Sequence, residues 1–309
     1  MKYTALSSLI VASLSADSKI GYEPYYAGTQ LAAYPLNSSP GHFSINPFVA
    51  YIMSNGSYNS HWSKKSGKSF HQAILYNSIG TGITDWLDTS IYFGNSYQQT
   101  GSHSRWGIVD TSLYFGIQLL QGSKNDWTPD MRILFGETFP TGKYDRLDPQ
   151  KQWADLFGRG SYASSFTFLI ARTFYNNPHH PFNINLNLSY LYSSSVHVHG
   201  ISYYGGDTGT RGRVFPKASY YADLAFQLSL NQFWALGLDI YYVHENKTRF
   251  HGKSTLKPIL PSNDQFSLAP CLEYSWSENG CMGVGPWFSI AGRNTSAFFG
   301  LLGNAYWYF

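Results

Sequence analysis

Phe-Phe-Gly-Leu-Leu-Gly-Asn-Ala-Tyr-Trp-Tyr-Phe, residues 298–309, is the stretch that decides how the rest of the sequence is interpreted. Successive side chains of a β-strand point to opposite faces, so every second residue shares a face. One face here would carry Phe299, Leu301, Gly303, Ala305, Trp307 and Phe309, and the other would be mixed, with Asn304 and Tyr306. We therefore predict a strand over 298–309 with one apolar and one mixed face.

An aromatic final residue, preceded by apolar residues at alternate positions, resembles the last strand of bacterial outer-membrane β-barrels. The resemblance implies that Trp307 and Phe309 belong to the signal that the barrel-assembly machinery recognises. Because an open sheet edge is not viable in lipid, we predict that 298–309 pairs with the first strand, at residues 43–54. The alternative is a closing strand buried in a soluble β-protein.

The composition favours a membrane barrel. Of the 309 residues, 43% are hydrophobic, 18% are aromatic and only 13% are charged, whereas about 25% of the residues in soluble domains are charged. Aromatic rings suit the membrane interface, where the ring lies in hydrocarbon and the polar tip in water. No run of eighteen apolar residues occurs, which excludes a helical membrane protein. The net charge of +3, from scattered Lys and Arg residues, argues against nucleic acid as a partner.

The strand pattern recurs along the chain. It is clearest in 182–193, where even positions are apolar or aromatic and odd positions are mostly Asn and Ser. The predicted strands are 43–54, 69–79, 84–97, 105–119, 129–140, 161–175, 181–193, 217–230, 233–245, 264–276, 281–291 and 297–309. The predicted fold is therefore all-β, an antiparallel up-and-down transmembrane β-barrel of about twelve strands.

The connections between these strands alternate in length. Long ones, at 55–68, 141–160, 194–216 and 246–263, are separated by shorter ones such as 231–232. Outer-membrane barrels have short periplasmic turns and longer external loops, so we expect both ends of the barrel segment on the periplasmic side. The polar strand faces use Asn, Ser, Thr, Gly and Tyr rather than Lys and Glu, which indicates a confined, wet interior.

The chain is predicted to have three parts. Residues 1–16 resemble a short signal peptide, because a basic start is followed by an apolar run and by small residues. Residues 17–42 are predicted to form a periplasmic N-terminal strap or partial plug, since three prolines prevent long regular structure and several tyrosines make a free tail unfavourable. Residues 43–309 are predicted to form the barrel.

Turning the apolar strand faces outward leaves charged and aromatic groups inside. The pore-lining candidates are Asp88, Tyr92, Asp110, Tyr114, Arg132, Asp223, Asp239 and Glu273. Charged groups inside a membrane barrel are usually paired, and Arg132 is predicted to pair with Asp110 or Asp130. These groups would either hold a narrow barrel in shape or form a constriction whose acidic excess disfavours anions.

The sequence indicates no cofactor and no metal site. Cys271 and Cys281 are predicted to lie at different heights of one hairpin, too far apart for a disulfide, and they lack the spacing of zinc ligands. His61-Trp62-Ser63 resembles the His-x-Ser of outer-membrane phospholipase A, in which the His would take the Ser proton. Because the triplet falls in a predicted loop, with no strand to orient it, we predict no catalytic residue and no enzyme.

Two motifs resemble a transporter family. Pro-Thr-Gly-x-Tyr-Asp at 140–145, at the end of a predicted strand, and Gly-His-Phe-x-Ile-x-Pro at 41–47 are similar to motifs of the meta-pathway phenol-degradation transporters, which are outer-membrane barrels. The resemblance covers these motifs and the barrel layout. It implies passive uptake of small solutes, hydrophobic or aromatic ones among them, across the outer membrane of a Gram-negative-type bacterium.

The expected partners of such a channel are outer-membrane lipid and lipopolysaccharide, the barrel-assembly machinery and a small-molecule solute. Two alternatives to a channel stay open at this stage. One is a lipid-modifying, phospholipase-like barrel enzyme, in which Ser63 would be the nucleophile. The other is a sealed structural or adhesive surface barrel, whose function would be confined to the loops at 141–160 and 194–216.

Overall fold

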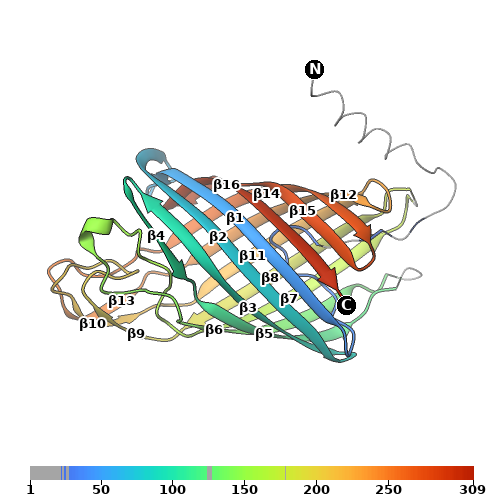
Figure 1. Ribbon diagram of the computed structural model, residues 1–309, viewed down its shortest axis with the longest axis horizontal. Helices are drawn as coiled ribbons and strands as arrows, with labels where there is room; N and C mark the ends of the chain where they lie inside the picture. The colour runs from blue at the N-terminus through green and yellow to red at the C-terminus, as the bar shows by residue number, and fades with distance from the viewer. Residues whose placement is uncertain (1–21, 23, 26–27, 124–126, 178) are drawn as a thin grey trace, which may run out of the picture.

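The computed structural model describes residue 22 and residues 24–25, 28–123, 127–177 and 179–309. The predicted signal peptide, 1–16, lies outside these residues. The described chain forms a barrel of long, tilted strands (Figure 1). No helix among the described residues is long and apolar enough to cross a membrane.

The large sheet is antiparallel and closes on itself. Its strands are β1 (Phe43–Tyr58), β2 (Lys64–Thr84), β3 (Leu87–Thr100), β4 (His103–Ile108), β5 (Thr111–Leu120), β6 (Asp130–Phe139), β7 (Ala163–Phe174), β8 (Phe182–Ser193), β11 (Ser219–Ser229), β12 (Trp234–Glu245), β14 (Asn263–Ser277), β15 (Gly280–Arg293) and β16 (Thr295–Tyr308). β4 and β5 pair with successive parts of β3 and so form one interrupted strand. The prediction of an all-β barrel of twelve strands is confirmed.

The first and last strands of the barrel pair with each other, as predicted. The β1–β16 ladder runs from Ser44 opposite Tyr308 to Tyr58 opposite Thr295. Beyond its end, the backbone N–H of Phe43 donates to the carbonyl of Phe309 at 3.0 Å. The closing strand therefore has a hydrogen-bonded partner on each side, since β15 pairs with its other edge.

Alternating residues of each strand face the interior and the outside. Along β11, Tyr220 is 47% exposed and Leu228 is 38% exposed, whereas Asp223 and Gln227 between them are buried. The outside of the other strands carries exposed apolar side chains such as Val49, Leu75, Ile91, Phe135, Leu188, Ile240 and Leu301. An apolar surface of this extent is unfavourable in water, and it matches the lipid-facing band of a membrane barrel.

Three predicted loops are corrected by the structure. Much of 55–68, predicted as a long loop, is strand, because β1 and β2 continue beyond a bulge near Ser54 and pair Gly56–Tyr58 with Lys64–Ser66. The long links 194–216 and 246–263 contain β9 (Val196–His199), β10 (Arg211–Phe215) and β13 (Arg249–Lys253). These segments are polar, short or glycine-containing, so the apolar alternation of a membrane strand is weak or absent in them.

The strands β9, β10 and β13 form a separate antiparallel sheet. It lies at the end of the barrel away from the C-terminus (Figure 1). One face of this sheet packs Val196, Val198 and Val214 around Tyr204 in a small hydrophobic core. We call this sheet the cap sheet.

Candidate functional site: the strap and the mouth of the barrel

A segment of the chain before β1 is hydrogen-bonded to the inner wall of the barrel. We call residues 28–42 the strap. Its contacts begin on β12, continue on β8 and β6, and end on β3 and β16. Since β12 and β3 are separated by five strands of the closed sheet in one direction, these contacts carry the strap across the lumen.

Asp239 on β12 is the first anchor of the strap. Its carboxylate accepts the backbone N–H groups of Gln30 at 3.1 Å, Leu31 at 3.3 Å and Ala32 at 3.3 Å. The hydroxyl of Thr29 also donates to it. The Asp239 side chain is fully buried, and a carboxylate that accepts several backbone N–H groups binds them more strongly than a neutral acceptor would. The anchor therefore holds the strap by its backbone.

The middle of the strap is held by two amide side chains of β8. Asn187 Oδ1 accepts the N–H of Ala33 at 3.1 Å, and Asn185 Nδ2 donates to the carbonyl of Ala33 at 2.9 Å. Arg132 on β6 continues this pattern, because its Nη1 donates to the carbonyls of Tyr34 at 2.8 Å and Leu36 at 3.0 Å. Each of these wall residues again contacts the strap backbone.

The predicted pairing of Arg132 with Asp110 or Asp130 is wrong. Arg132 Nη2 lies 2.5 and 2.6 Å from the two carboxylate oxygens of Asp88 on β3. The guanidinium reaches across β5 because Gly116, which is opposite Asp88, has no side chain. A Cβ at Gly116 would overlap both charged groups. Asp88 also accepts the N–H of Ser38 at 2.9 Å, so the ion pair is a second anchor of the strap.

The other predicted pore-lining residues have different surroundings. Tyr92 and Tyr114 pack edge to face, with ring centroids 5.2 Å apart. Glu273 accepts the side-chain amide of Gln227 at 2.7 Å. Asp223 is 3% exposed, and neither of its carboxylate oxygens has a hydrogen-bond partner among the described residues. The pore-lining role of these residues stays a prediction.

The last of these candidates, Asp110, holds an external loop. Its carboxylate accepts the N–H groups of Gly142 and Arg159, both at 2.9 Å. Asp110 lies at the break between β4 and β5, which leaves its carboxylate near the loop that connects β6 and β7. Asp110 therefore fixes the point from which the Arg159 side chain extends.

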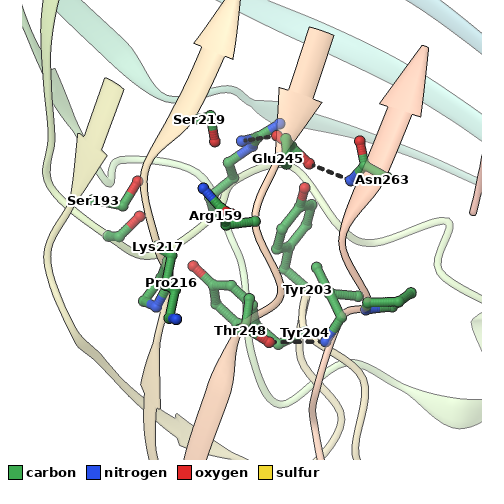
Figure 2. A pocket seen from close by; sticks show the side chains of 14 residues that line it. Arg159, Ser193, Tyr203, Tyr204, Pro216, Lys217, Ser219, Glu245, Thr248 and Asn263 are labelled. Atoms are coloured by element: carbon green, nitrogen blue, oxygen red, sulfur yellow. Dashed lines mark hydrogen bonds and ion pairs between the residues drawn. The ribbon is translucent and has the colours of Figure 1, made fainter. Parts of the chain in front are cut away.

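Arg159 lies at the end of the barrel that the cap sheet occupies. We call residues 200–210 and 254–262, which follow β9 and β13, the cap loops. Figure 2 shows the Arg159 side chain among residues from β11, β12 and the cap loops. Arg159 Nη1 donates to Glu245 Oε1 at 2.9 Å, and its guanidinium lies 5.3 Å from the ring centroid of Tyr203. Glu245 also accepts the side-chain amide of Asn263 at 2.8 Å. A pocket beside this group is lined by Lys217, Tyr204 and several Ser and Asn side chains.

The inner wall also contains apolar residues that are not among the predicted pore-lining residues. Leu169 is fully buried between Thr167 and Ala171 on β7, and Leu302 is 1% exposed opposite Ala50. Ile52 shares the inner face of β1 with Ala50. They were missed because the pore-lining candidates were chosen among charged and aromatic residues alone. Their presence makes the lumen partly apolar.

The remaining candidates for chemistry do not form a reactive site. The hydroxyl of Ser63 donates to the carbonyl of His61 at 3.5 Å, not to its imidazole. Asn59 accepts the N–H groups of His61 at 2.8 Å and Ser63 at 3.1 Å, which is the geometry of a capped hairpin turn. Cys271 and Cys281 are free and buried. Within the described ranges, no cluster of three or more metal-ligating side chains occurs.

No protein-family model and no curated protein matches the sequence. The fold is similar to that of the COG4313 outer membrane channel from Pseudomonas putida F1, with 14% identity over 90% of this chain and 99% of that one, and a TM-score of 0.68. Weaker similarities include the translocator domain of the autotransporter NalP from Neisseria meningitidis (11% identity, 98% and 96% coverage, TM-score 0.49) and the Ralstonia pickettii toluene transporter TbuX (8%, 93% and 98%, TM-score 0.43). The first similarity supports the outer-membrane barrel fold.

Proposed function

We propose that this protein is an outer-membrane channel for the passive uptake of small solutes, apolar or aromatic ones in particular. The observation that carries the proposal is a partly apolar lumen whose obstruction is non-covalent: the strap is held by hydrogen bonds to Asp239, Asn187 and the Asp88–Arg132 pair. Such contacts can open and re-form. The fold shared with an outer membrane channel supports the same conclusion.

In this proposal the strap is the partial plug. The predicted pore-lining residues line the path that a solute takes past the strap. Arg132, Asp88 and Asp239 would set how firmly the plug is seated. Leu169, Leu302 and Ile52 would provide the apolar surface along which an uncharged solute passes, because burial of apolar solute surface is favourable.

The direct test uses cells with an intact outer membrane, since apolar solutes cross plain phospholipid bilayers unaided. We expect the uncharged fluorescent probe N-phenyl-1-naphthylamine to enter cells that express the protein faster than matched cells without it. Uptake of an oligosaccharide should be unchanged. Equal probe uptake in the two strains would contradict the proposed function.

A sealed surface barrel is the second candidate, and it is favoured by the strap across the lumen and by the Arg159 contact at the external mouth. Planar-bilayer recordings separate the two functions. A channel should conduct, and removal of residues 28–39 should raise its conductance several-fold. A barrel that conducts in neither form is a sealed scaffold.

Two partners are part of the proposal. Trp307 and Phe309 are 37% and 65% exposed on the final strand, where the assembly machinery could contact them, and lipopolysaccharide would surround the external half of the barrel. Replacing both residues by Ala should lower the amount of protein assembled in the outer membrane without preventing refolding of the purified chain in detergent. Unchanged assembly would argue against the signal.

A further inference from the structure

The outer face of the cap sheet is strongly basic. Because the sheet buries Val196, Val198 and Val214 on its inner face, the alternate residues of its strands point outward. Apart from Phe215, these outward residues are His197, His199, Arg211, Arg213, Arg249, His251 and Lys253, and all of the basic ones but His199 are exposed.

The cationic side chains stand opposite one another across the strands. Arg213 is paired in register with His197 on one side and His251 on the other. Arg211 is paired likewise with His199 and Lys253. Arg213 Nη2 donates a hydrogen bond to His197 Nε2 at 2.5 Å, since a guanidinium has no acceptor. Arg211 and Lys253 are like charges directly opposite each other, which is destabilising in a sheet, and an anion that binds between them would remove the repulsion.

Carboxylates do not neutralise this face. Among the described residues, the one carboxylate that pairs with a residue of this face is that of Asp145, which lies 3.6 Å from His199. Among the described residues, Arg211, Arg213, Arg249 and Lys253 form no ion pair. The face is therefore a surface of unpaired positive charge at the external end of the barrel.

A hollow beside β13 extends the basic surface beyond the sheet. It is lined by Lys217, Lys247, Thr248, Arg249, Phe250, His251 and Ile259, with no carboxylate among them. Arg249 and His251 belong both to the hollow and to the cap-sheet face, so the two form one continuous basic surface.

The charges inside the barrel indicate that the ligand of this basic surface does not pass through the lumen. An anionic solute that was concentrated at the mouth would meet Asp223, Asp239 and Glu273 in the lumen, all of them buried. The one cation that we predicted to line the pore, Arg132, is already paired with Asp88. A basic surface at the mouth of an acidic lumen is suited to docking, not to conducting anions.

We propose that the outer face of the cap sheet and the hollow beside it bind the phosphate groups of lipopolysaccharide. The inference rests on the proposed outer-membrane location, which places these residues at the leaflet that carries such phosphates. Arginine binds phosphate through paired N–H donors, and lysine adds a point charge. Bound lipopolysaccharide would hold the cap loops around Arg159 at the mouth.

The test uses the purified full-length protein in detergent, with deep-rough lipopolysaccharide as the probe and calorimetry as the readout. The variant R211Q/R213Q/R249Q/K253Q removes four exposed cations from the face. Its affinity should fall at least about tenfold, because each cation near an anionic surface contributes on the order of 1 kcal/mol. Added salt should weaken the wild type more than the variant.

The matched control is K64Q/K65Q/K68Q/R105Q, which removes the same charge from exposed positions on β2 and β4 and should bind nearly as the wild type does. Far-ultraviolet circular dichroism checks folding. If the first variant does not fold, K217Q/K247Q in the hollow replaces it, with a several-fold loss expected.

Three results would overturn the inference: equal affinity for dephosphorylated lipopolysaccharide, an equal loss in the control variant, or tighter binding of inorganic polyphosphate or duplex DNA than of lipopolysaccharide. Probe uptake by cells is measured separately. Normal probe uptake without phosphate binding would contradict the binding of lipopolysaccharide alone. Normal phosphate binding without probe uptake would contradict the channel function alone.

Discussion

The strap and the external mouth of the barrel are held by different kinds of contact. At the strap, buried wall side chains bind backbone groups, as Asp239 does with Gln30, Leu31 and Ala32. At the external mouth, one side chain, Arg159, pairs with another, Glu245, and the arginine side chain is 44% exposed. The comparison indicates a firmly seated plug at one place and a weakly held contact at the other.

Arg132 at the strap and Arg159 at the external mouth differ in the same way. Arg132 is 7% exposed and its ion pair with Asp88 is shielded from water, so loss of either partner leaves an unpaired buried charge. Arg159 can be rehydrated when its contact breaks. Burial, more than the presence of an ion pair, should therefore decide how much each arginine contributes to stability.

The largest effect is expected from Arg132→Gln. It leaves Asp88 buried without its cation, which typically costs about 3–5 kcal/mol, and thermal unfolding in detergent should report a lower midpoint. The double variant Arg132→Gln/Asp88→Asn removes the stranded charge and should recover part of the loss. If Arg132→Gln were as stable as the wild type, burial of the ion pair would not decide how much an arginine contributes to stability.

Asp239→Asn should loosen the strap by about 1.5–3 kcal/mol, because backbone N–H groups lose a charged acceptor. The measurement is the labelling rate of Ala33→Cys by a membrane-impermeant maleimide, which should rise. Asp223→Asn is the control, since Asp223 is buried on the neighbouring strand and has no hydrogen bond among the described residues. Equal labelling in both variants would show that Asp239 is no anchor.

Arg159→Gln should change stability by less than about 1 kcal/mol, as exposed ion pairs do, but it should raise the open probability in planar bilayers. Lys143→Gln is the matched control, because Lys143 is equally exposed, at 44%, and pairs with Asp155 on the same loop. If Lys143→Gln conducted as much as Arg159→Gln, the Arg159–Glu245 pair would have no particular effect on opening.

The smallest effect is expected on the stability of the cap loops when the pH is lowered. The backbone N–H groups of Leu256 at 2.6 Å and Gly209 at 2.8 Å hold the pKa of Asp207 below its ordinary value. A lowered pKa in the folded state means that this contact stabilises the loops above the ordinary pKa and is lost as pH falls through the lowered one.

Spin labels at positions 208 and 255 should therefore become more mobile relative to each other at acid pH. Asp207→Asn should be mobile already at neutral pH. Identical pH profiles for the wild type and the variant would contradict the assignment.

Much of the barrel could be predicted from the sequence. The period-two pattern of 182–193 and 298–309 places the strands to within a few residues, because membrane strands must alternate between lipid and lumen. The pattern fails where lipid no longer imposes it: in the hairpin extension at Gly56–Tyr58, and in β9, β10 and β13. It placed Leu302 on the mixed face of the last strand, and that face is the inner one.

The site was predicted less completely. The acidic and aromatic residues of the inner face were found from strand parity, but the partner of Arg132 was not. That partner depends on which strands are neighbours and on Gly116, which leaves space across β5. Arg159 lies in a loop without any period, so no sequence signal distinguished it.

By itself, the sequence determined a closed β-barrel with its terminal strands paired, because alternating side chains and the absence of open edges in lipid leave few other arrangements. Only the tertiary structure decided what the lumen contains. The strap is bound through its backbone N–H and C=O groups, which every residue carries, so no side-chain pattern records its path. The basic face of the cap sheet likewise depends on a strand register that sets His197, Arg213 and His251 side by side.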